Sequence, residues 1–312
     1  MKIVAQMDEI SSINIKTDST FAILLEAQNR GHEIFYYLPS ELNFEVKSET
    51  LFALVKKIKL KNELGNHFEI LDKKQENLVN FDVILVRQDP PFDMNYITST
   101  YLLEKIKNQV LILNDPSEIR NSSEKIFATD FPDLSPPTLI SSGIENVREF
   151  REVHGDIILK PLYARGGEGV VLIKKDDLNF NSIFELLFKT YQTPLLAQKF
   201  IPEIKDGDKR IILLNGEVVG GIARIAKGDI RSNLHIGGYA AKLKLSARDL
   251  EICRIIAPEL KKRKLFFVGI DVIGDYLTEI NVTSPTCIRE LNELDGICVE
   301  EMVVRAIEDW KI

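Results

Sequence analysis

Residues 268–289 read VGIDVIGDYLTEINVTSPTCIR, with two runs of β-forming residues around a Gly-Asp pair. Such a pattern predicts a β-hairpin that turns near Gly274–Asp275. Three polar side chains that strands usually exclude, Asp271, Glu279 and Asn281, lie in this apolar frame. Glu279 and Asn281 are two positions apart, so they point to the same face of their strand.

The register of the hairpin decides whether the two acids share a face. Asp271 joins Glu279 on one face only if the two residues lie directly opposite each other. A tight two-residue turn at Gly274–Asp275 would place them on opposite faces. We therefore expect a three-residue loop, 274–276, or a bulge beside the turn.

Two carboxylates and one amide carbonyl on one face offer hard oxygen ligands and no sulfur or imidazole. This donor set suits Mg²⁺, which keeps several waters and shares its remaining positions with substrate phosphates. The alternative interpretation is a polar hairpin edge that carries acids and binds no metal.

Composition limits the classes of function. The 312 residues have room for roughly two domains and a large core. Forty-seven acidic residues against forty lysines and arginines give a net charge of −7, which argues against nucleic acid or an anionic membrane as the main partner. The N-terminus does not resemble a signal peptide, and no apolar run approaches the length of a membrane span, so we expect a cytoplasmic protein.

The first part of the chain alternates predicted strands and helices. A strand at 2–7, a helix that ends at Gly31 and a strand at 33–38 form a β-α-β unit, which predicts a parallel sheet. The loop at 8–17 contains no glycine, so it is not expected to bind a dinucleotide. Residues 87–93 are polar and follow a buried strand, where open α/β sheets place ligands; a rigid surface turn is the alternative.

A glycine-rich loop follows the predicted strand at 156–160. It contains no G-K-[ST] sequence, so it is not a P-loop. Glycines beside Lys160 and Arg165 can still place backbone N–H groups over phosphates as a mobile lid, and a plain glycine hairpin is the alternative. Lys125 stands in the first turn of a predicted short helix, an unfavourable place for a cation unless an anion compensates it.

Two further segments carry candidate ligand-binding residues. Arg210 and Arg224 lie at the open end of a hairpin predicted at Asn215-Gly216, where they suit carboxylate or phosphate oxygens; a salt-bridged sheet end is the alternative. Residues 227–241 form a long polar stretch that we expect to be a loop, as in lids and binding loops.

No signature of covalent catalysis is present in the sequence. The four histidines are scattered without metal-ligand spacing, and there is no G-x-S-x-G motif. Three cysteines without C-x-x-C spacing fit reduced thiols, and we expect Cys287 to pack and not to react.

Several of these strings together resemble one family. Residues 270–290, 18–21, 89–93, 158–161 and 204–210 resemble bacterial glutathione synthetase, a member of the ATP-grasp superfamily, and residues 231–238 do so more loosely. The resemblance implies an α/β plus α+β chain. An N-terminal parallel α/β (pre-ATP-grasp) domain, 1–121, precedes an ATP-grasp domain, 122–312, with a lid subdomain at about 122–194 and a central subdomain at about 195–312.

The resemblance implies an ATP-dependent ligase that joins γ-glutamylcysteine to glycine through an acylphosphate. It assigns catalytic roles to Arg210, Arg224 and Asn233. It also implies that Asp271, Glu279 and Asn281 bind two Mg²⁺ ions, for which Mn²⁺ can substitute. It assigns ATP to Lys125, Lys160, Gly166, Gly167, Gln198, Lys199, Phe200, Ile201 and Asp208. Substrate contacts are expected at Lys16, Arg87, Arg231, Ser284, Thr286 and Arg289. A homotetramer is also implied.

The chain departs from the family pattern at the lid and in the first domain. Residues 163–169 read YARGGEG where the family has Asp-Gly-Met-Gly-Gly and a small residue, and Gln88 replaces a usual lysine. The nearer alternative function is another ATP-grasp carboxylate–amine ligase. The farther one is an ATP-binding regulator without turnover, against which the complete set of metal ligands and lysines argues.

Overall fold

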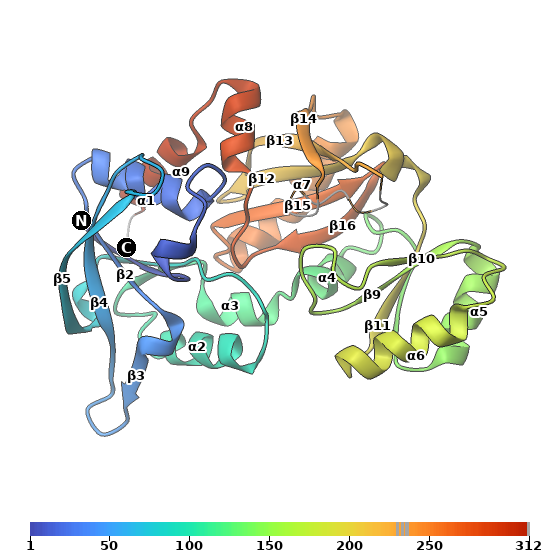
Figure 1. Cartoon of the computed structure of the whole chain (residues 1–312), viewed down its shortest axis with the longest axis horizontal. Coiled ribbons are helices and arrows are strands. Elements are labelled where there is room, and N and C mark those ends of the chain that lie inside the picture. The colour runs from blue at the N-terminus through green and yellow to red at the C-terminus, as the bar shows by residue number, and fades with distance from the viewer. Residues whose placement is uncertain (229–230, 232–233, 235–236, 311–312) are drawn as a thin grey trace.

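The computed structural model describes residues 1–228, 231, 234 and 237–310. Its described strands form three sheets with helices packed on their faces (Figure 1). The N-terminal sheet lies on one side, and the two later sheets lie on the other, one above the other in this view. Helix α9 (Val299–Glu308) runs back to the N-terminal sheet and packs against α1 (Ser19–Asn29) (Figure 1).

The N-terminal sheet has seven strands in the order β3-β4-β2-β1-β6-β7, with β5 paired to β4. The strands are β1 (Lys2–Gln6), β2 (Glu33–Tyr37), β3 (Leu42–Glu45), β4 (Thr50–Leu60), β5 (Phe68–Asn77), β6 (Val83–Val86) and β7 (Leu111–Leu113). Strands β1, β2, β6 and β7 are parallel, as the β-α-β pattern predicts. The charged stretch between β2 and β6, which the sequence leaves without a prediction, adds the antiparallel strands β3, β4 and β5.

Helices cover both faces of this sheet. They are α1 (Ser19–Asn29), α2 (Met94–Glu104), α3 (Pro116–Asn121), α8 (Ile288–Asp295) and α9 (Val299–Glu308). One core contains buried side chains of α1, α8 and α9, and another contains those of α2 and α3. The carboxylate of Asp18 accepts a hydrogen bond from the backbone N–H of Phe21, so Asp18 caps the start of α1.

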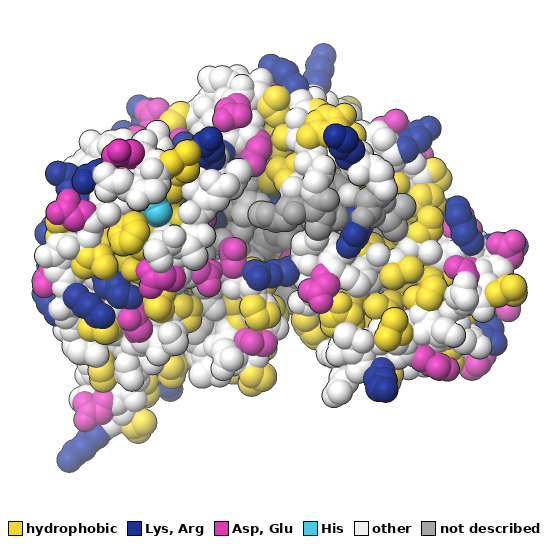
Figure 2. All heavy atoms as spheres, viewed as in Figure 1, with side chains coloured by type: hydrophobic (Ala, Val, Ile, Leu, Met, Phe, Trp, Pro, Cys, Tyr) yellow, Lys and Arg dark blue, Asp and Glu magenta, His cyan; other side chains and the backbone are white. Residues whose placement is uncertain are grey.

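A four-stranded antiparallel sheet forms the lower lobe on the right of Figure 1. Its order is β10-β9-β11-β8, from β8 (Thr138–Ser141), β9 (Ile157–Pro161), β10 (Val171–Ile173) and β11 (Leu195–Lys199). Helices α5 (Ile144–His154) and α6 (Phe180–Tyr191) pack on it around Phe180, Phe184 and Leu187. A notch in the molecular outline separates this lobe from the N-terminal one (Figure 2).

A five-stranded antiparallel sheet completes the fold in the order β14-β13-β12-β15-β16. It consists of β12 (Asp208–Leu214), β13 (Glu217–Ile225), β14 (Tyr239–Lys242), β15 (Phe267–Ile273) and β16 (Tyr276–Asn281). Helices α4 (Glu124–Phe127) and α7 (Ala247–Lys262) contribute to its core. Single 3₁₀ turns lie at Ile10–Ser12, Pro39–Glu41, Leu78–Asn80, Ala128–Asp130 and Pro202–Asp206.

The stretch 227–241 differs from the expected loop in its described part. Its end belongs to β14, which pairs with the outer edge of β13 through Ile225 and Tyr239. The alternation of apolar and polar residues that indicates a strand is weak in β14, because β14 is short and only half-buried. Among the described residues, no helix has the length and apolar character needed to cross a membrane.

The hairpin of β15 and β16 has the register that the acids require. Asp271 lies opposite Glu279, and the register shifts between Asp271 and Val272, where Leu277 becomes the partner. The turn is the tight Gly274–Asp275 pair, so the bulge, and not a three-residue loop, brings the acids together.

Candidate functional site

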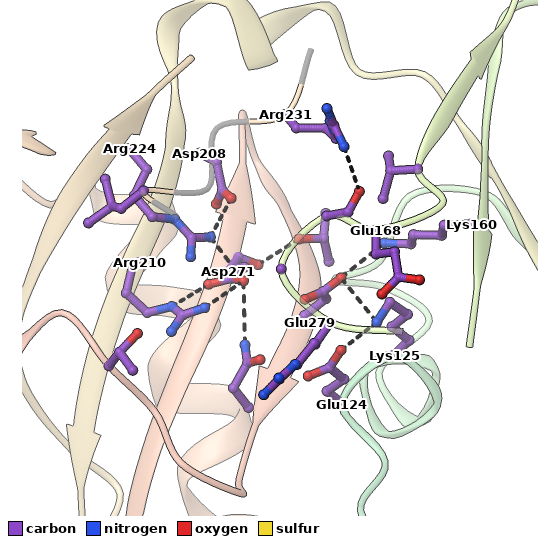
Figure 3. A pocket seen from close by; sticks show the side chains of 18 of the residues that line it. Glu124, Lys125, Lys160, Glu168, Asp208, Arg210, Arg224, Arg231, Asp271 and Glu279 are labelled. Carbon is purple, nitrogen blue, oxygen red and sulfur yellow. Dashed lines mark hydrogen bonds and ion pairs between the residues drawn. The ribbon is translucent and has the colours of Figure 1, made fainter. Parts of the chain in front are cut away.

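A cavity lies between the sheets β8–β11 and β12–β16 and extends to the loops that follow β1 and β6 of the N-terminal sheet. Its volume is about 820 Å³, which falls in the range of small-molecule sites. The hairpin strands β15 and β16 supply its floor, and β9 and α4 supply the opposite wall (Figure 3). Its lining includes charged side chains of both signs.

Asp271 stands at the centre of a buried ion-pair network. Its carboxylate accepts a hydrogen bond from Arg210 Nη2 at 2.9 Å and pairs with Arg224 Nη2 at 3.0 Å (Figure 3). Burial alone would raise the pKa of Asp271, but the two guanidinium groups outweigh it and hold that pKa well below its usual range. Asp271 is therefore a carboxylate at every physiological pH, although only 4% of it is exposed.

Arg224 also pairs with Asp208, which follows the turn after β11. Burial raises the pKa of Asp208 to about 6, against the attraction of Arg224. The Nε–H of Arg224 is buried and donates to no acceptor among the described residues. Because a buried donor without an acceptor is costly, this atom points to an acceptor that arrives with a ligand.

Lys125 and Lys160 converge on Glu279 from two different elements. Lys160 on β9 donates to Glu279 Oε1 at 3.3 Å, and Lys125 on α4 lies 3.9 Å from the same oxygen (Figure 3). Burial would lower the pKa of Lys125, but Glu279 and Glu124 raise it. Burial alone would raise the pKa of Glu279. The positive charges of Lys125 and Lys160 outweigh burial, so the pKa of Glu279 is lowered. Lys125 is thus charged inside the pocket.

Two loops close over this wall. Lys125 Nζ donates to the backbone oxygen of Ala164 at 2.8 Å, which holds the first part of the glycine loop against α4. Arg231 Nη1 donates to the backbone oxygen of Gly167 at 3.4 Å, so the two predicted lid segments touch each other. The backbone φ angles of Gly166 and Gly167 are 60° and 82°, which glycine adopts at the lowest cost.

The other end of the pocket is apolar and lies along β11 and the chain after it. Ile158, Ile201 and Ile273 line it together with Phe200. Gln198 is buried and donates from Nε2 to Thr138 Oγ1 at 2.9 Å. A planar aromatic group suits such a slot, because its apolar faces can pack against the walls and no unpaired polar atom is buried there.

The donor set on the hairpin is compatible with a divalent cation shared with phosphates. Asp271, Glu279 and Asn281 all line the pocket, and Asn281 Nδ2 lies 3.4 Å from Asp271 Oδ2. Within the described residues, no group of three or more His, Cys, Asp or Glu side chains could enclose a metal by itself. Two carboxylates and one amide leave coordination positions for phosphate oxygens and water, which is the arrangement that Mg²⁺ favours.

The structure brings most of the predicted residues into the pocket wall. Lys125, Lys160, Gly166, Gly167, Gln198, Lys199, Phe200, Ile201, Asp208, Arg210, Arg224, Arg231, Asp271, Glu279, Asn281, Ser284 and Thr286 line it. Asn233 lies outside the described residues.

Three predicted substrate contacts do not line the pocket. Lys16 is exposed beside it. Arg87 is buried, donating to Thr20 Oγ1 and to the backbone oxygen of Pro285, both at 3.0 Å. Arg289 donates to the backbone oxygen of Ile15 at 2.9 Å. The two arginines therefore support backbone next to the pocket, which sequence position alone does not distinguish from direct contact.

Sequence reasoning missed several wall residues, of which Glu124 is the most consequential. Glu124 pairs with Lys125, and burial raises the pKa of its carboxylate. In the sequence it looks like an ordinary acid in the first turn of a helix. Asn14 and Thr17 were also missed, because they belong to a loop whose fold no short motif indicates.

Cys287 lines the pocket as well, at the N-terminal end of α8. Burial raises the pKa of its thiol, so the reactive thiolate is disfavoured at neutral pH.

Family models match nearly the whole chain. The N-terminal domain of prokaryotic glutathione synthetase matches residues 1–120, and the ATP-grasp domain of the same family matches residues 124–296. The glutathione synthetase of Agrobacterium fabrum is 50% identical, over 98% of this chain and 96% of its own. Those of Brucella melitensis and Vibrio parahaemolyticus are 48% and 44% identical, each over 99% of this chain and 98% of its own.

Solved structures support the fold. D-cycloserine synthetase superimposes with a TM-score of 0.68 at 11% identity, over 98% of this chain and 99% of that one. D-alanyl-alanine synthetase A of Vibrio cholerae superimposes with a TM-score of 0.61 at 13% identity, over 99% and 98%. At such identities the likeness concerns the fold alone. The matched models and the relatives together show that the chain belongs to the prokaryotic glutathione synthetase family and has the ATP-grasp fold.

Proposed function

We propose that the pocket is the active site in which this ATP-dependent ligase of glutathione synthesis joins γ-glutamylcysteine to glycine, with ADP and phosphate as the other products. One observation carries the assignment to this pocket. The Arg210–Arg224–Asp271 network and the Lys125–Lys160–Glu279 cluster face each other across a single cavity. Buried cations on both sides suit a polyanionic substrate, and the acids between them suit the metal that accompanies it.

ATP would lie along the pocket with its adenine in the apolar slot. Gln198, Lys199, Phe200 and Ile201 would contact the base, and Asp208 would lie near the ribose. Lys125 and Lys160 would bind phosphate oxygens, with Gly166 and Gly167 closing over them. The support for this direction is that Lys160 lies opposite Leu196 on β9 and β11, whereas Phe200 and Ile201 follow the far end of β11.

Asp271, Glu279 and Asn281 would hold Mg²⁺, which we infer as two ions with Mn²⁺ as a substitute. The cations would neutralise phosphate charge and fix the orientation of the triphosphate. Their arrival would also change the ion pairs, because Arg210 and Lys160 now bind the carboxylates that the metal would take. The freed guanidinium and ammonium groups could then turn to phosphate oxygens.

The chemistry that we propose needs no nucleophile from the protein. A carboxylate is a poor acyl donor, so its oxygen first attacks the γ-phosphorus of ATP and ADP leaves. The glycine amine then attacks the acyl carbon of the acylphosphate; phosphate leaves, and the amine loses a proton. Arg210 and Arg224 would stabilise the negative charge that both steps place on oxygen.

The pocket wall also offers surfaces for the acid and the amine. Ser284 and Thr286 follow β16, and Arg231 reaches the lid from the second loop. We assign substrate contacts to these three residues. Lys16 and Asn233 are further candidates from the family resemblance. Arg87 and Arg289 we assign to the support of the loops that touch the substrate.

We further propose the division 1–121 and 122–312 into an N-terminal and an ATP-grasp domain, a homotetramer, and a cytoplasmic location. Support for the division comes from two separate cores, one on the α2 and α3 face of the N-terminal sheet and one in the β8–β11 lobe. Another core crosses the boundary, because β12, β13, α8 and α9 pack together with the N-terminal sheet and α1. Sedimentation at equilibrium tests the tetramer directly: a species of about four chain masses is expected, and a monomer at working concentration would contradict it.

The function is tested by ADP release from Mg·ATP and γ-glutamylcysteine, with and without glycine, while the peptide is followed by mass. Glycine-dependent ADP in equal amount with glutathione is expected. ADP release that ignores glycine would instead point to another acceptor amine, and the absence of ADP would point to an ATP-binding regulator.

A further inference from the structure

The lid loop carries an arginine that the mechanism above does not use. Residues 163–169 read YARGGEG, and Arg165 lines the pocket while remaining exposed. No hydrogen bond or ion pair of its guanidinium group joins it to another residue in the described part of the chain. Arginine is a costly choice at such a place unless its charge and donors have a use, because its side chain loses much rotamer freedom when fixed.

The anchoring of the loop determines where this guanidinium can reach. Lys125 binds the backbone oxygen of Ala164, the residue directly before Arg165. At the other end, a side chain at Gly169 would lie 2.7 Å from Pro161 Cγ, so the loop is packed closely there too. Arg165 therefore starts beside the lysines that we assign to the phosphates.

The strand register separates Arg165 from the adenine slot. On the paired strands β9 and β11, Pro161 lies opposite Leu195, whereas Ile157 lies opposite Lys199. The lid leaves the sheet at the Pro161 end, and the adenine slot lies at the Lys199 end. Four residues of β-strand span about 13 Å, so the lid and the slot are at different ends of the nucleotide site.

The charge balance of the pocket favours an anion as the partner of Arg165. Lys125, Lys160, Arg210 and Arg224 already face carboxylates. The lid's own acid, Glu168, is bound by Tyr191, whose hydroxyl donates to Glu168 Oε1 at 2.9 Å. Glu168 is therefore held at the end of α6, and Arg165 is left as the cation that the lid can present.

We propose that Arg165 is a phosphate-binding residue, whose guanidinium donates to the β- and γ-phosphate oxygens of ATP when the lid closes. The inference rests on the proposed function, in that it takes Lys125 and Lys160 as the phosphate end of the pocket. Arginine matches phosphate with two parallel N–H donors, which a lysine or an apolar residue cannot do. The lid of this chain thus contributes binding energy to the nucleotide in addition to excluding water.

The test is the affinity of the Arg165→Met variant for nucleotides, measured by calorimetry on the full chain with Mg²⁺ and without dipeptide or glycine. The Kd for a non-hydrolysable ATP analogue should rise about tenfold, the scale of one charge-assisted contact. The Kd for adenosine, which has no phosphate, should stay within twofold. Arg165→Lys should lose less affinity than Arg165→Met, because the charge remains and only the paired donors are lost.

A matched control is Lys175→Met, which removes the same charge from an exposed site after β10 and outside the pocket wall. It should leave both Kd values within twofold. The inference is overturned if Arg165→Met binds the ATP analogue as tightly as the wild type, or if it loses the same factor for adenosine. Failure of the wild type to bind the analogue at all would instead refute the proposed function, so the two failures are distinguishable.

Discussion

Asp271 and Glu279 lie directly opposite each other on β15 and β16, and a bulge beside the turn is what brings them into register. Each acid faces a different set of cations: Asp271 faces two arginines, and Glu279 faces two lysines. The hairpin thus places its two carboxylates between the arginines and lysines that we assign to the reacting and the anchoring phosphates.

Replacing Arg210 should slow the reaction without preventing nucleotide binding. Arg210→Ala should lower kcat by about 10²–10³, the scale for losing one group that stabilises developing charge. The KM for ATP should change much less. Steady-state kinetics with γ-glutamylcysteine and glycine measure both. Arg305→Ala, an exposed arginine of α9 outside the pocket wall, is the control. A loss below threefold would remove Arg210 from the mechanism.

Replacing Glu279 should change the demand for metal. Glu279→Gln keeps the shape of the side chain but removes a charged ligand, so the Mg²⁺ concentration for half-maximal ADP formation should rise at least about tenfold. A titration of Mg²⁺ at fixed ATP measures it. Glu185→Gln, an exposed acid on α6, should leave the titration unchanged. An unaltered Mg²⁺ requirement in Glu279→Gln would exclude this residue as a ligand.

The buried carboxyl of Asp208 should make stability depend on pH. Its pKa is raised from 3.8 to about 6, so the folded state binds this proton more tightly than the unfolded state. The contribution to the free energy of unfolding is fully present below pH 3.8 and is lost as the pH rises through about 6.

Urea unfolding between pH 4 and 7 tests this linkage. The free energy of unfolding of Asp208→Asn, taken relative to the wild type, should rise with pH across this window, because the variant lacks the titration. Parallel pH profiles for the two proteins would show that Asp208 has the same pKa in both states.

Arg289 should act on substrate binding through the loop that it holds. Its Nη2 donates to the backbone oxygen of Ile15, and Asn14 and Thr17 of the same loop line the pocket. Arg289→Met should raise the KM for γ-glutamylcysteine about fivefold, the scale of one lost hydrogen bond to a charged group. The KM for ATP should stay within twofold. Equal increases in both KM values would indicate a general loss of structure.

Two glycines of the lid should differ in their tolerance of a side chain. Gly166 and Gly169 both have positive φ, at 60° and 68°, but a Cβ at Gly169 would meet Pro161 and Tyr191, whereas one at Gly166 meets nothing within 4 Å. Gly166→Ala should cost about 1 kcal/mol of unfolding free energy from the backbone alone. Gly169→Ala should cost about 2 kcal/mol more because of the overlap. Equal costs would show that the loop end relaxes freely.

Much of the fold could be predicted from local patterns. The Asn215-Gly216 turn and the β-α-β start are both found, because each depends on neighbours in the sequence. Strands β3, β5 and β14 could not be predicted, because they are exposed or half-exposed edge elements whose burial patterns are weak. Strand β4 is an inner strand with alternating buried positions, and its lysines conceal that alternation in the sequence.

The candidate site was predictable where acids and arginines interrupt apolar strands, as at Asp271 and Arg210. It was not predictable where a contact depends on packing between distant segments. The burial of Glu124 against Lys125 and the use of Arg87 to support the Pro285 backbone, instead of lining the pocket, both arise from such packing. The sequence around Glu124 looks like that of an ordinary helix start, and the sequence around Arg87 looks like a ligand-binding turn.

The central claim is that this pocket activates the carboxylate of γ-glutamylcysteine by phosphoryl transfer from ATP. The most direct measurement follows ¹⁸O from that carboxylate, in a single reaction with ATP and glycine, into inorganic phosphate by mass spectrometry. If an acylphosphate forms, one labelled oxygen should appear in phosphate for each glutathione made. Glutathione formed together with unlabelled phosphate would contradict the account.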